Sequence, residues 1–366
     1  MGFKQSTLEN LVINPQFWKG KKVFLTGHTG FKGSWMSLWL QKLGVNLIGF
    51  SESIPTEPSL CKLTNIQEKM ISIFGDIRKY SDLEEILREH KPEIIIHMAA
   101  QSLVKKSYED PMKTFTTNIM GTVNIFESIR QIGNPCIILN VTSDKCYENI
   151  GKTLAYTETD PIGGYDPYSS SKGCSELITS SYRNSFFNSK STESKISLAS
   201  VRAGNVIGGG DWSENRLVPD IMKGVLNKEK IKIRNPDSIR PWQFVLEPLH
   251  GYLLLIEKLA ENSSEYDQAW NFGPNEKESR SVSFLIQKLA EGWGKEIQIE
   301  CESSDRYEEK ILMLNSDKAR IKLGWQPKMN LELTIKWITE WYKKYQKGEN
   351  MKKITEQQID EYSLLS

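Results

Sequence analysis

The chain has 366 residues, which is enough for one large α/β domain with a lobe or for two domains. Hydrophobic residues make up 39% of it and charged residues 25%, an ordinary composition for a soluble globular protein. The net charge of +1 argues against a surface for nucleic acid or membrane built from bulk charge, so we expect neither partner.

Cysteines and histidines favour a reducing compartment and no metal site. The five cysteines are scattered and form no CxxC pair, and the four histidines stand at no ligand spacing. No apolar stretch approaches the length of a membrane span, and no apolar segment typical of a signal peptide follows the first residues. We therefore expect a cytoplasmic protein.

Short apolar runs alternate with helical patterns along the first half of the chain. Strands are predicted at 22–26, 45–50, 71–74, 93–97, 136–142 and 196–206. Helices are predicted at 33–43, 81–90, 111–132 and 167–188, the second of them opened by a capping box at 81–84. This alternation, almost without hairpin signals, predicts an α/β fold with a Rossmann-like doubly wound parallel sheet over residues 18–206.

The alternation ends near residue 207. Residues 207–346 mix helical and short strand patterns, which predicts a smaller C-terminal α/β lobe for substrate binding. The segment 270–274 reads as a strand and turn, and this strand can return to the main sheet. The tail 347–366 is polar and charged, which is typical of a disordered chain end.

A glycine-rich turn connects the first strand with the first helix. Gly27, Gly30 and Gly33 allow close backbone approach, and the helix N-terminus offers free N–H groups to a pyrophosphate. Because the turn follows the first strand of an alternating chain, it predicts a dinucleotide site that also includes Thr29 and the Phe31–Lys32 pair.

The second and third strands are predicted to place residues against the adenosine. Ser51 stands where a ribose-binding aspartate is expected, so either Ser51 or Glu52 would contact the ribose, and the choice between NAD and NADP stays open. Asp76 and Ile77 are placed to contact the adenine, with a helix cap as the alternative for Asp76.

The fourth strand is followed by small residues that let a dinucleotide lie over the sheet edge. These are Ala99 and Ala100, and Gln101 comes next. Asn118, within the helix 111–132, is predicted to be a buried polar residue with either a structural or a functional role.

Two acid/base pairs carry the predicted chemistry. Tyr168 and Lys172 are four residues apart and share one face of a helix, where the ammonium can lower the pKa of the phenol and make it a usable base. Asp144 and Lys145 follow the apolar run 136–141 and form a second pair, unless they are a surface ion pair. One acid/base pair can support the oxidation of an alcohol. Two pairs could support that oxidation, an elimination at the neighbouring carbons and the reduction of the product.

These motifs resemble the extended short-chain dehydrogenase/reductases over roughly residues 18–345. The stretches 27–35, 142–148, 163–173, 202–212 and 240–248 are, more narrowly, similar to CDP-glucose 4,6-dehydratases. The resemblance implies NAD as cofactor and conversion of CDP-glucose to CDP-4-keto-6-deoxyglucose. The steps would be oxidation at C4, loss of water across C5 and C6, and return of hydride to C6.

The resemblance also implies a role for each residue of the two pairs. Tyr168 would take the proton of the 4-hydroxyl, Lys172 would lower the pKa of Tyr168, and Ser143 would hydrogen-bond the 4-oxygen. Asp144 would act as the acid toward the 6-hydroxyl and Lys145 as the base at C5, which requires a neutral lysine.

Candidates for the substrate diphosphate are Asn205, Arg234 and Arg240, because arginine suits bidentate phosphate recognition. The resemblance points most clearly to Asn205 and Arg240. It further implies a CDP-hexose substrate and a homodimer formed through the helices 111–132 and 167–188.

Two alternatives stay open. One is another nucleotide-sugar enzyme of the same fold, either a 4,6-dehydratase for a different sugar nucleotide or a 4-epimerase, which would have no need of Asp144 and Lys145. The other is a non-catalytic dinucleotide-binding protein, which would have no reason to keep Ser143, Tyr168 and Lys172 together.

Overall fold

The computed structural model describes residues 12–151, 154–187, 195–233, 235–294, 297–301 and 312–365. At its centre is a seven-stranded sheet in the order β11-β6-β5-β4-β1-β2-β3, in which every pairing is parallel. Its strands are β1 (Lys22–Thr26), β2 (Asn46–Ser51), β3 (Ile71–Phe74), β4 (Ile94–His97), β5 (Cys136–Val141), β6 (Ile196–Arg202) and β11 (Ala269–Asn271). The predicted doubly wound parallel sheet is confirmed, and β11 comes from the segment predicted to return to it.

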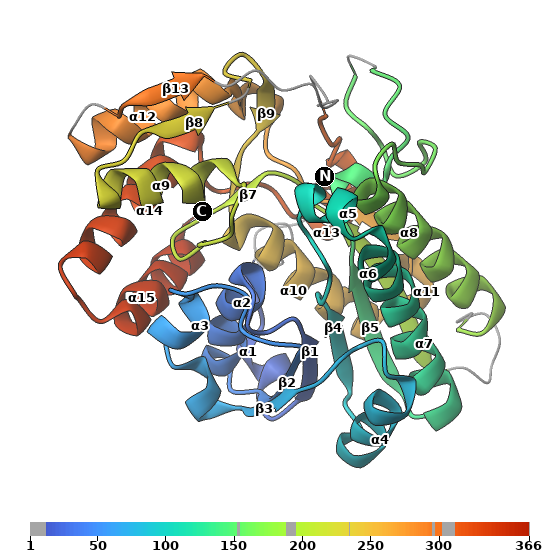
Figure 1. Ribbon diagram of the computed structural model, residues 1–366. Coiled ribbons are helices and arrows are strands. Elements are labelled where there is room, and N and C mark those ends of the chain that lie inside the picture. Colours follow the sequence, from blue (N-terminus) through green and yellow to red (C-terminus); the bar gives the residue numbers. More distant parts are fainter. Residues whose placement is uncertain are drawn as a thin grey trace, which may run out of the picture.

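Helices cover both faces of this sheet (Figure 1). One face is covered by α4 (Tyr80–His90), α7 (Gly121–Ile132) and α8 (Pro167–Ser185), and the other by α2 (Phe31–Lys42) and α10 (Leu246–Glu261). The central strands are apolar on both sides, as in β4, where Ile95 joins one core cluster and Ile94 and Ile96 join the other.

The strand order reverses between β1 and β4, which lie side by side although two strands separate them in the sequence. Connections leave the carboxyl ends of these strands toward opposite faces, so a crevice forms there, where ligands of such sheets bind. The glycine-rich turn follows β1 and the segment 98–101 follows β4, so both lie at this crevice.

The smaller lobe is built on three two-stranded sheets in the upper part of Figure 1. They pair β7 (Val206–Ile207) with β10 (Gln243–Phe244), β8 (Ile231–Ile233) with β13 (Ile299–Cys301), and β9 (Ile239–Pro241) with β12 (Ser279–Ser281). The helices of the lobe include α9 (Leu217–Asn227), α12 (Val282–Trp293) and α14 (Leu331–Gln346). The strand predicted at 196–206 is confirmed as β6, but it ends at Arg202, and Asn205 in a left-handed conformation (φ 51°) lies between it and β7.

The remaining helices are short, except for the last. They are α1 (Pro15–Trp18), α3 (Leu60–Leu63), η2 (Ile66–Lys69), α5 (Val104–Glu109), α6 (Pro111–Phe115), the π-helical turn η3 (Thr116–Met120), η4 (Asp144–Cys146), α11 (Ser263–Tyr266), η5 (Glu276–Glu278), α13 (Asp317–Leu323) and α15 (Met351–Leu364). The predicted helix 111–132 is thus continuous from α6 to α7 with a π-helical turn inside it. The predicted capping box is wrong, since α4 starts after Lys79 and the Ser81 hydroxyl donates to Asp82.

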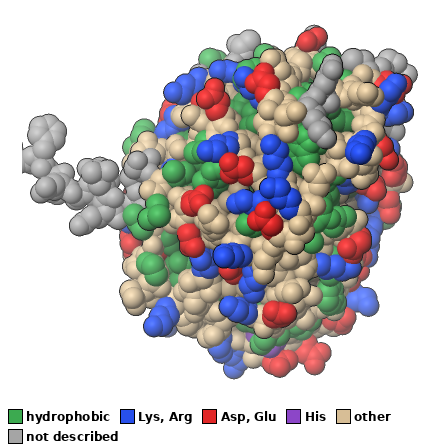
Figure 2. Space-filling view, turned by 90° about the vertical axis from the view of Figure 1, so that its left-hand side faces the viewer, with side chains coloured by type: hydrophobic (Ala, Val, Ile, Leu, Met, Phe, Trp, Pro, Cys, Tyr) green, Lys and Arg blue, Asp and Glu red, His purple; other side chains and the backbone are tan. Residues whose placement is uncertain are grey.

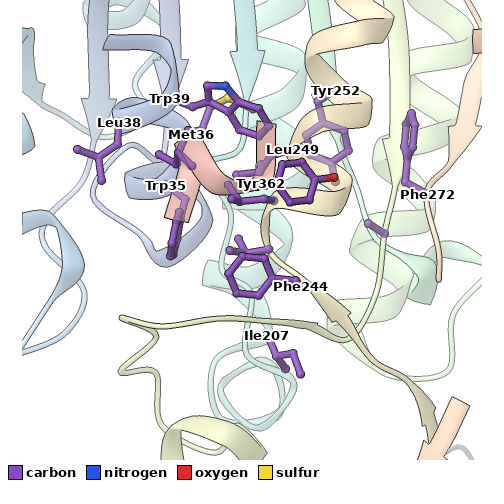
Figure 3. Close-up of a cluster of buried hydrophobic side chains, with 14 of the residues drawn as sticks. Trp35, Met36, Leu38, Trp39, Ile207, Phe244, Leu249, Tyr252, Phe272 and Tyr362 are labelled. Carbon is purple, nitrogen blue, oxygen red and sulfur yellow. The ribbon is translucent and has the colours of Figure 1, made fainter. Parts of the chain in front are cut away.

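The expected disorder of the tail is also wrong, because Met351–Leu364 forms α15 and packs against the main core. Figure 3 shows Tyr362 of α15 among Trp39 of α2 and Leu249 of α10. The Tyr362 and Trp39 rings lie 5.8 Å apart between centroids, and the Tyr362 hydroxyl donates to the buried Glu247 of α10 at 2.9 Å. Buried residues recur every three or four positions along this helix, so its polar composition conceals an amphipathic pattern.

On the face shown in Figure 2, acidic and basic side chains are intermixed, as the net charge of +1 leads one to expect. Within the described ranges, no helix is long and apolar enough to cross a membrane. The same residues contain no cluster of three or more histidine, cysteine or acidic side chains that could hold a metal ion.

Candidate active site

At the β1–β4 crevice, the backbone of the glycine-rich turn lies close to the backbone of the segment after β4 and to the start of α2. Gly27 has a φ of +75°, and a Cβ added there would lie 2.9 Å from the Ala99 nitrogen. A Cβ at Gly33 would lie 2.0 Å from the Gly27 carbonyl oxygen. Only glycine fits these two positions, and Gly30, the N-cap of α2, has no side chain to occupy the helix N-terminus. The turn therefore offers the first N–H groups of α2 to an anion, as a dinucleotide pyrophosphate requires.

Ser51 is engaged within the protein rather than pointing freely into the crevice. Its hydroxyl lies 2.9 Å from His28 Nδ1 and accepts from the Thr29 N–H at 3.4 Å. Burial lowers the pKa of His28 to about 4, so the imidazole is neutral and its Nε2 lies 2.8 Å from the Ser72 hydroxyl. Thr29 in turn donates to the Ser53 carbonyl at 2.7 Å. These contacts fix the turn against β2 and β3.

Glu52 is the exposed alternative at this position, and it forms ion pairs with Arg78 and Lys113. Asp76 accepts hydrogen bonds from the Arg78 backbone and guanidinium, and the Arg78 bond lowers the pKa of Asp76. The helix-cap alternative for Asp76 fails, because the N-cap of α4 is Lys79.

Asp76 and Arg78 also line an open pocket with Thr116, Met120 and Asn124, where an adenosine could lie. Ile77 is buried in the core beneath, and a Cβ at Gly121 would come within 2.8 Å of its side chain.

Asn118 connects the end of β4 with α8. Its Oδ1 accepts from the Gln101 N–H at 2.8 Å, and its Nδ2 donates to the Gln101 carbonyl and to Ser171 Oγ. Ala99 and Ala100 form the turn just before Gln101, at the crevice. Of the two roles predicted for Asn118, these contacts supply the structural one, because they fix the crevice relative to α8.

The predicted acid/base segment follows β5 as the one-turn helix η4. Ser143 caps it, accepting from the Lys145 N–H at 3.2 Å and donating to Asp144 Oδ1 at 2.9 Å. Asp144 is only 5% exposed, whereas Lys145 is partly exposed. The alternative of a surface ion pair after β5 is therefore wrong, because the aspartate lies inside the protein.

Tyr168 and Lys172 start α8 and both are buried beside this segment. Burial raises the pKa of Tyr168 to about 12, while a hydrogen bond with Ser143 and the charge of Arg216 oppose the rise. Burial lowers the pKa of Lys172 to about 8, and its ammonium donates to the Val141 carbonyl at 3.2 Å. Burial outweighs the nearby charges that act on the Tyr168 pKa, and the lowering of this pKa by Lys172 stays a prediction.

Lys32 and Arg216 bring further positive charge to the same place. Burial, followed by the charges of Arg216 and Lys172, lowers the pKa of Lys32 to about 8, and Asp144 opposes this. Arg216 donates to Ser102 of the main domain and to Asp211 of the lobe, both at 3.2 Å. Lys32 was predicted as a cofactor residue and lies within electrostatic range of the acid/base residues as well. Arg216 was not predicted, because nothing in its local sequence distinguishes it from a surface arginine.

The three residues predicted to bind the substrate diphosphate lie in different parts of the chain, and the structure describes two of them. Asn205 is partly exposed in the turn between β6 and β7, and its carbonyl accepts from the Gln243 N–H. Arg240 lies on β9 directly opposite Arg280 of β12. Arg234 lies outside the described residues.

A buried ion pair of Glu176 and Arg202 behind the acid/base segment also went unpredicted, as did the close approach of Gly204 to Asp144. Glu176 continues the spacing of Tyr168 and Lys172 by four residues, which is the one signal that could have indicated it.

Known proteins resemble this chain over most of its length. The family model for GDP-mannose 4,6 dehydratase matches residues 24–338. A CDP-glucose 4,6-dehydratase of Salmonella typhimurium is 46% identical over 353 residues, which cover 96% of this chain and 98% of the relative. A dTDP-glucose 4,6-dehydratase of Xanthomonas campestris is 23% identical over 337 residues, covering 87% and 92% of the two chains.

Solved structures share the fold. A dTDP-glucose 4,6-dehydratase from Bacillus anthracis in complex with NAD has a TM-score of 0.73 at 20% identity, covering 91% of this chain and 100% of that one. A dTDP-glucose 4,6-dehydratase from Streptomyces venezuelae with NAD has a TM-score of 0.77 at 18% identity, covering 89% and 98%.

Proposed function

The chain belongs to the nucleotide-sugar 4,6-dehydratases, a branch of the extended short-chain dehydrogenase/reductases, and on this basis we propose that it converts CDP-glucose to CDP-4-keto-6-deoxyglucose with NAD as its cofactor. The observation that carries the proposal is the convergence of Ser143, Asp144 and Tyr168 at the carboxyl end of β5. A 4-epimerase would use Tyr168 but would have no use for a buried carboxyl group at position 144.

The glycine-rich turn fits the proposed cofactor, because Gly27 and Gly33 admit no side chain and α2 presents its N-terminus. Bound NAD would accept the hydrogen at C4 with its bonding electrons and return it to C6, while C5 regains a proton. For the first step Tyr168 removes the proton of the 4-hydroxyl, and Ser143 hydrogen-bonds the same oxygen. Lys172, whose ammonium donates to the carbonyl of Val141 at the end of β5, would hold the nicotinamide ribose.

The loss of water uses the second acid/base pair. Once C4 is a ketone, the proton at C5 becomes acidic, and Lys145 removes it. Asp144 donates a proton to the 6-hydroxyl, so that water leaves as the C5–C6 double bond forms. Asp144 and Lys145 follow each other on η4, shortly after β5, and Ser143 is the N-cap of this turn. This proximity supports the proposal that both pairs act on one sugar.

The diphosphate of the substrate is assigned to Asn205, Arg234 and Arg240, as the sequence predicts, and to Arg216. Two observations support the assignment of Arg216. Its guanidinium donates to the main domain and to the lobe, which border the crevice, and its positive charge opposes the rise in the Tyr168 pKa.

A homodimer through the helices 111–132 and 167–188 is part of the proposal. Apolar side chains on these helices face solvent, including Met112, Met120 and Leu177 with exposed fractions of 71%, 48% and 59%. We also propose a cytoplasmic location, which the free thiols of Cys61, Cys136, Cys146 and Cys174 support.

The decisive experiment incubates the protein and NAD with CDP-, dTDP-, UDP- and GDP-glucose and measures the ultraviolet absorbance of a 4-keto sugar in alkali. We expect a signal with CDP-glucose, its loss in Tyr168→Phe, and a strong reduction in Lys145→Ala. A signal confined to another sugar nucleotide would contradict the substrate. Near wild-type elimination in Lys145→Ala would contradict the base at C5.

A further inference from the structure

A buried ion pair lies directly behind the acid/base segment. Glu176 of α8 and Arg202 at the end of β6 are 2.8 Å apart, with side chains that are 3% and 4% exposed. Burial alone would raise the pKa of Glu176, but the charge of Arg202 and the surrounding hydrogen bonds hold that pKa below its ordinary value. The pair is therefore ionised in the folded protein.

Such a pair contributes little to stability by itself. Removing two charges from water costs about as much as their attraction returns, and well-packed apolar residues often replace buried pairs without loss. Neither residue reaches the reacting atoms in the proposed mechanism. The residues that the ion pair contacts therefore indicate its role better than its contribution to the free energy of folding does.

Glu176 holds the residue that precedes the catalytic segment. The Thr142 hydroxyl donates to Glu176 Oε1 at 2.5 Å, and the Ser200 hydroxyl donates to Oε2 at 2.8 Å. Thr142 is further fixed by its backbone N–H, which donates to the Val201 carbonyl at 2.9 Å. The chain is thus anchored one residue before Ser143.

Arg202 holds the residue that ends the same segment. Its Nη1 donates to the Tyr147 hydroxyl at 2.6 Å, and its guanidinium lies 4.8 Å from the centre of the Tyr147 ring. The Tyr147 hydroxyl in turn donates a hydrogen bond to Asn271 Oδ1 at 2.7 Å. Tyr147 directly follows η4, so one ion pair fixes both ends of the segment 142–147.

We propose that Glu176 and Arg202 are positioning residues for the elimination step, an inference that rests on the roles proposed for Asp144 and Lys145. The segment they hold carries both groups of the elimination, Asp144 and Lys145, whereas of the oxidation groups it carries only Ser143, because Tyr168 is placed by the backbone of α8. Disturbing the pair should therefore slow the loss of water more than the oxidation at C4.

The test is a quenched single turnover with NAD and CDP-glucose, in which the sugar nucleotides are separated by mass. The variants are Arg202→Met and Arg202→Lys, because an ammonium cannot reproduce the planar fork that reaches both Glu176 and Tyr147. We expect CDP-4-ketoglucose, oxidised but still holding its water, to accumulate. Elimination should be about 10- to 100-fold slower, as for a displacement of about 1 Å, while oxidation slows much less.

Asp144→Asn and Lys145→Ala serve as references in the same experiment. If they accumulate CDP-4-ketoglucose and the Arg202 variants do not, the positioning role is overturned and the proposed chemistry stands. If the two reference variants oxidise and eliminate normally, the roles of Asp144 and Lys145 fail, and the inference fails with them.

A double variant separates positioning from stability. Glu176→Leu with Arg202→Met leaves no lone buried charge, so its melting temperature should recover relative to Arg202→Met alone. We expect elimination to stay slow in the double variant. Recovery of elimination together with stability would show that the pair acts on folding only and would overturn the proposal.

Discussion

At the scale of single residues, the site depends on close contacts that no local sequence pattern reveals. Gly204 is an example, because a Cβ at this position would lie 1.7 Å from Asp144 Oδ2. The glycine follows β6, and Asp144 follows β5, so the contact arises only once the two strands are paired. Sequence reasoning could identify Asp144 by its neighbours in the motif but could not identify the glycine that makes room for it.

Gly204→Ala should therefore displace the carboxyl group of Asp144. We expect dehydration to fall about 100-fold, as for other small misplacements of a catalytic group. The steady-state rate of 4-keto sugar formation measures the loss, and Asp144→Asn sets its upper limit. Near wild-type turnover with an unchanged melting temperature would mean that the site accommodates the methyl group.

Glu247 is a second residue whose environment decides its behaviour. Burial raises its pKa to about 7, although Tyr362 and the backbone N–H groups of Lys328 and Met329 donate to it and oppose the rise. The folded protein therefore holds a proton that the unfolded chain releases near its ordinary pKa of 4.5. The resulting stability is fully present below that value and is lost as the pH rises toward 7.

Glu247→Gln should remove this pH dependence while keeping the donors satisfied. We expect urea unfolding of the wild type to lose on the order of 1–3 kcal/mol between pH 4.5 and 7 relative to the variant. Parallel pH profiles for the two proteins would show that Glu247 titrates alike in the folded and unfolded states.

At the scale of elements, the sequence predicts those strands, helices and turns that are determined by hydrophobic periodicity and by the positions of glycine and proline. The glycine-rich turn, the buried strands and the start of α8 at Pro167 all follow from local patterns, and the structure contains them. The break between β6 and β7 depends on one left-handed residue, Asn205, which the apolar run conceals. The helix α15 was missed because its hydrophobic residues are few and some of its main partners, such as Glu247, lie more than a hundred residues away.

Tyr362 tests whether α15 contributes to the core. Tyr362→Ala should lower the free energy of unfolding by about 3 kcal/mol or more, since a buried aromatic ring and the hydrogen bond to Glu247 are both lost. The matched control is Leu364→Ala on the same helix, where the side chain is 86% exposed and we expect almost no change. Equal effects of the two variants in thermal or urea unfolding would contradict the packing of α15.

At the scale of the whole molecule, the proposed homodimer can be tested at its exposed apolar side chains. Met112 and Leu177 lie exposed on the two helices proposed to pair in a dimer. Met112→Glu with Leu177→Glu should therefore shift the protein toward monomer, because like charges would meet within an apolar contact. Sedimentation velocity measures the shift, and Ile321→Glu on α13, where the side chain is 82% exposed, is the control. A double variant that sediments like the wild type would exclude these helices as the interface.

The position of β11 has a consequence for how the chain is made. This strand completes the main sheet beside β6, yet it is synthesised only after residues 207–268, which build much of the lobe. Until then β6 is an open edge, which is the kind of surface that pairs wrongly with other chains. A gene fragment ending at residue 206 would encode every other strand of the sheet and still yield an aggregation-prone product. The main sheet can therefore be completed only after residues 207–268 have been synthesised.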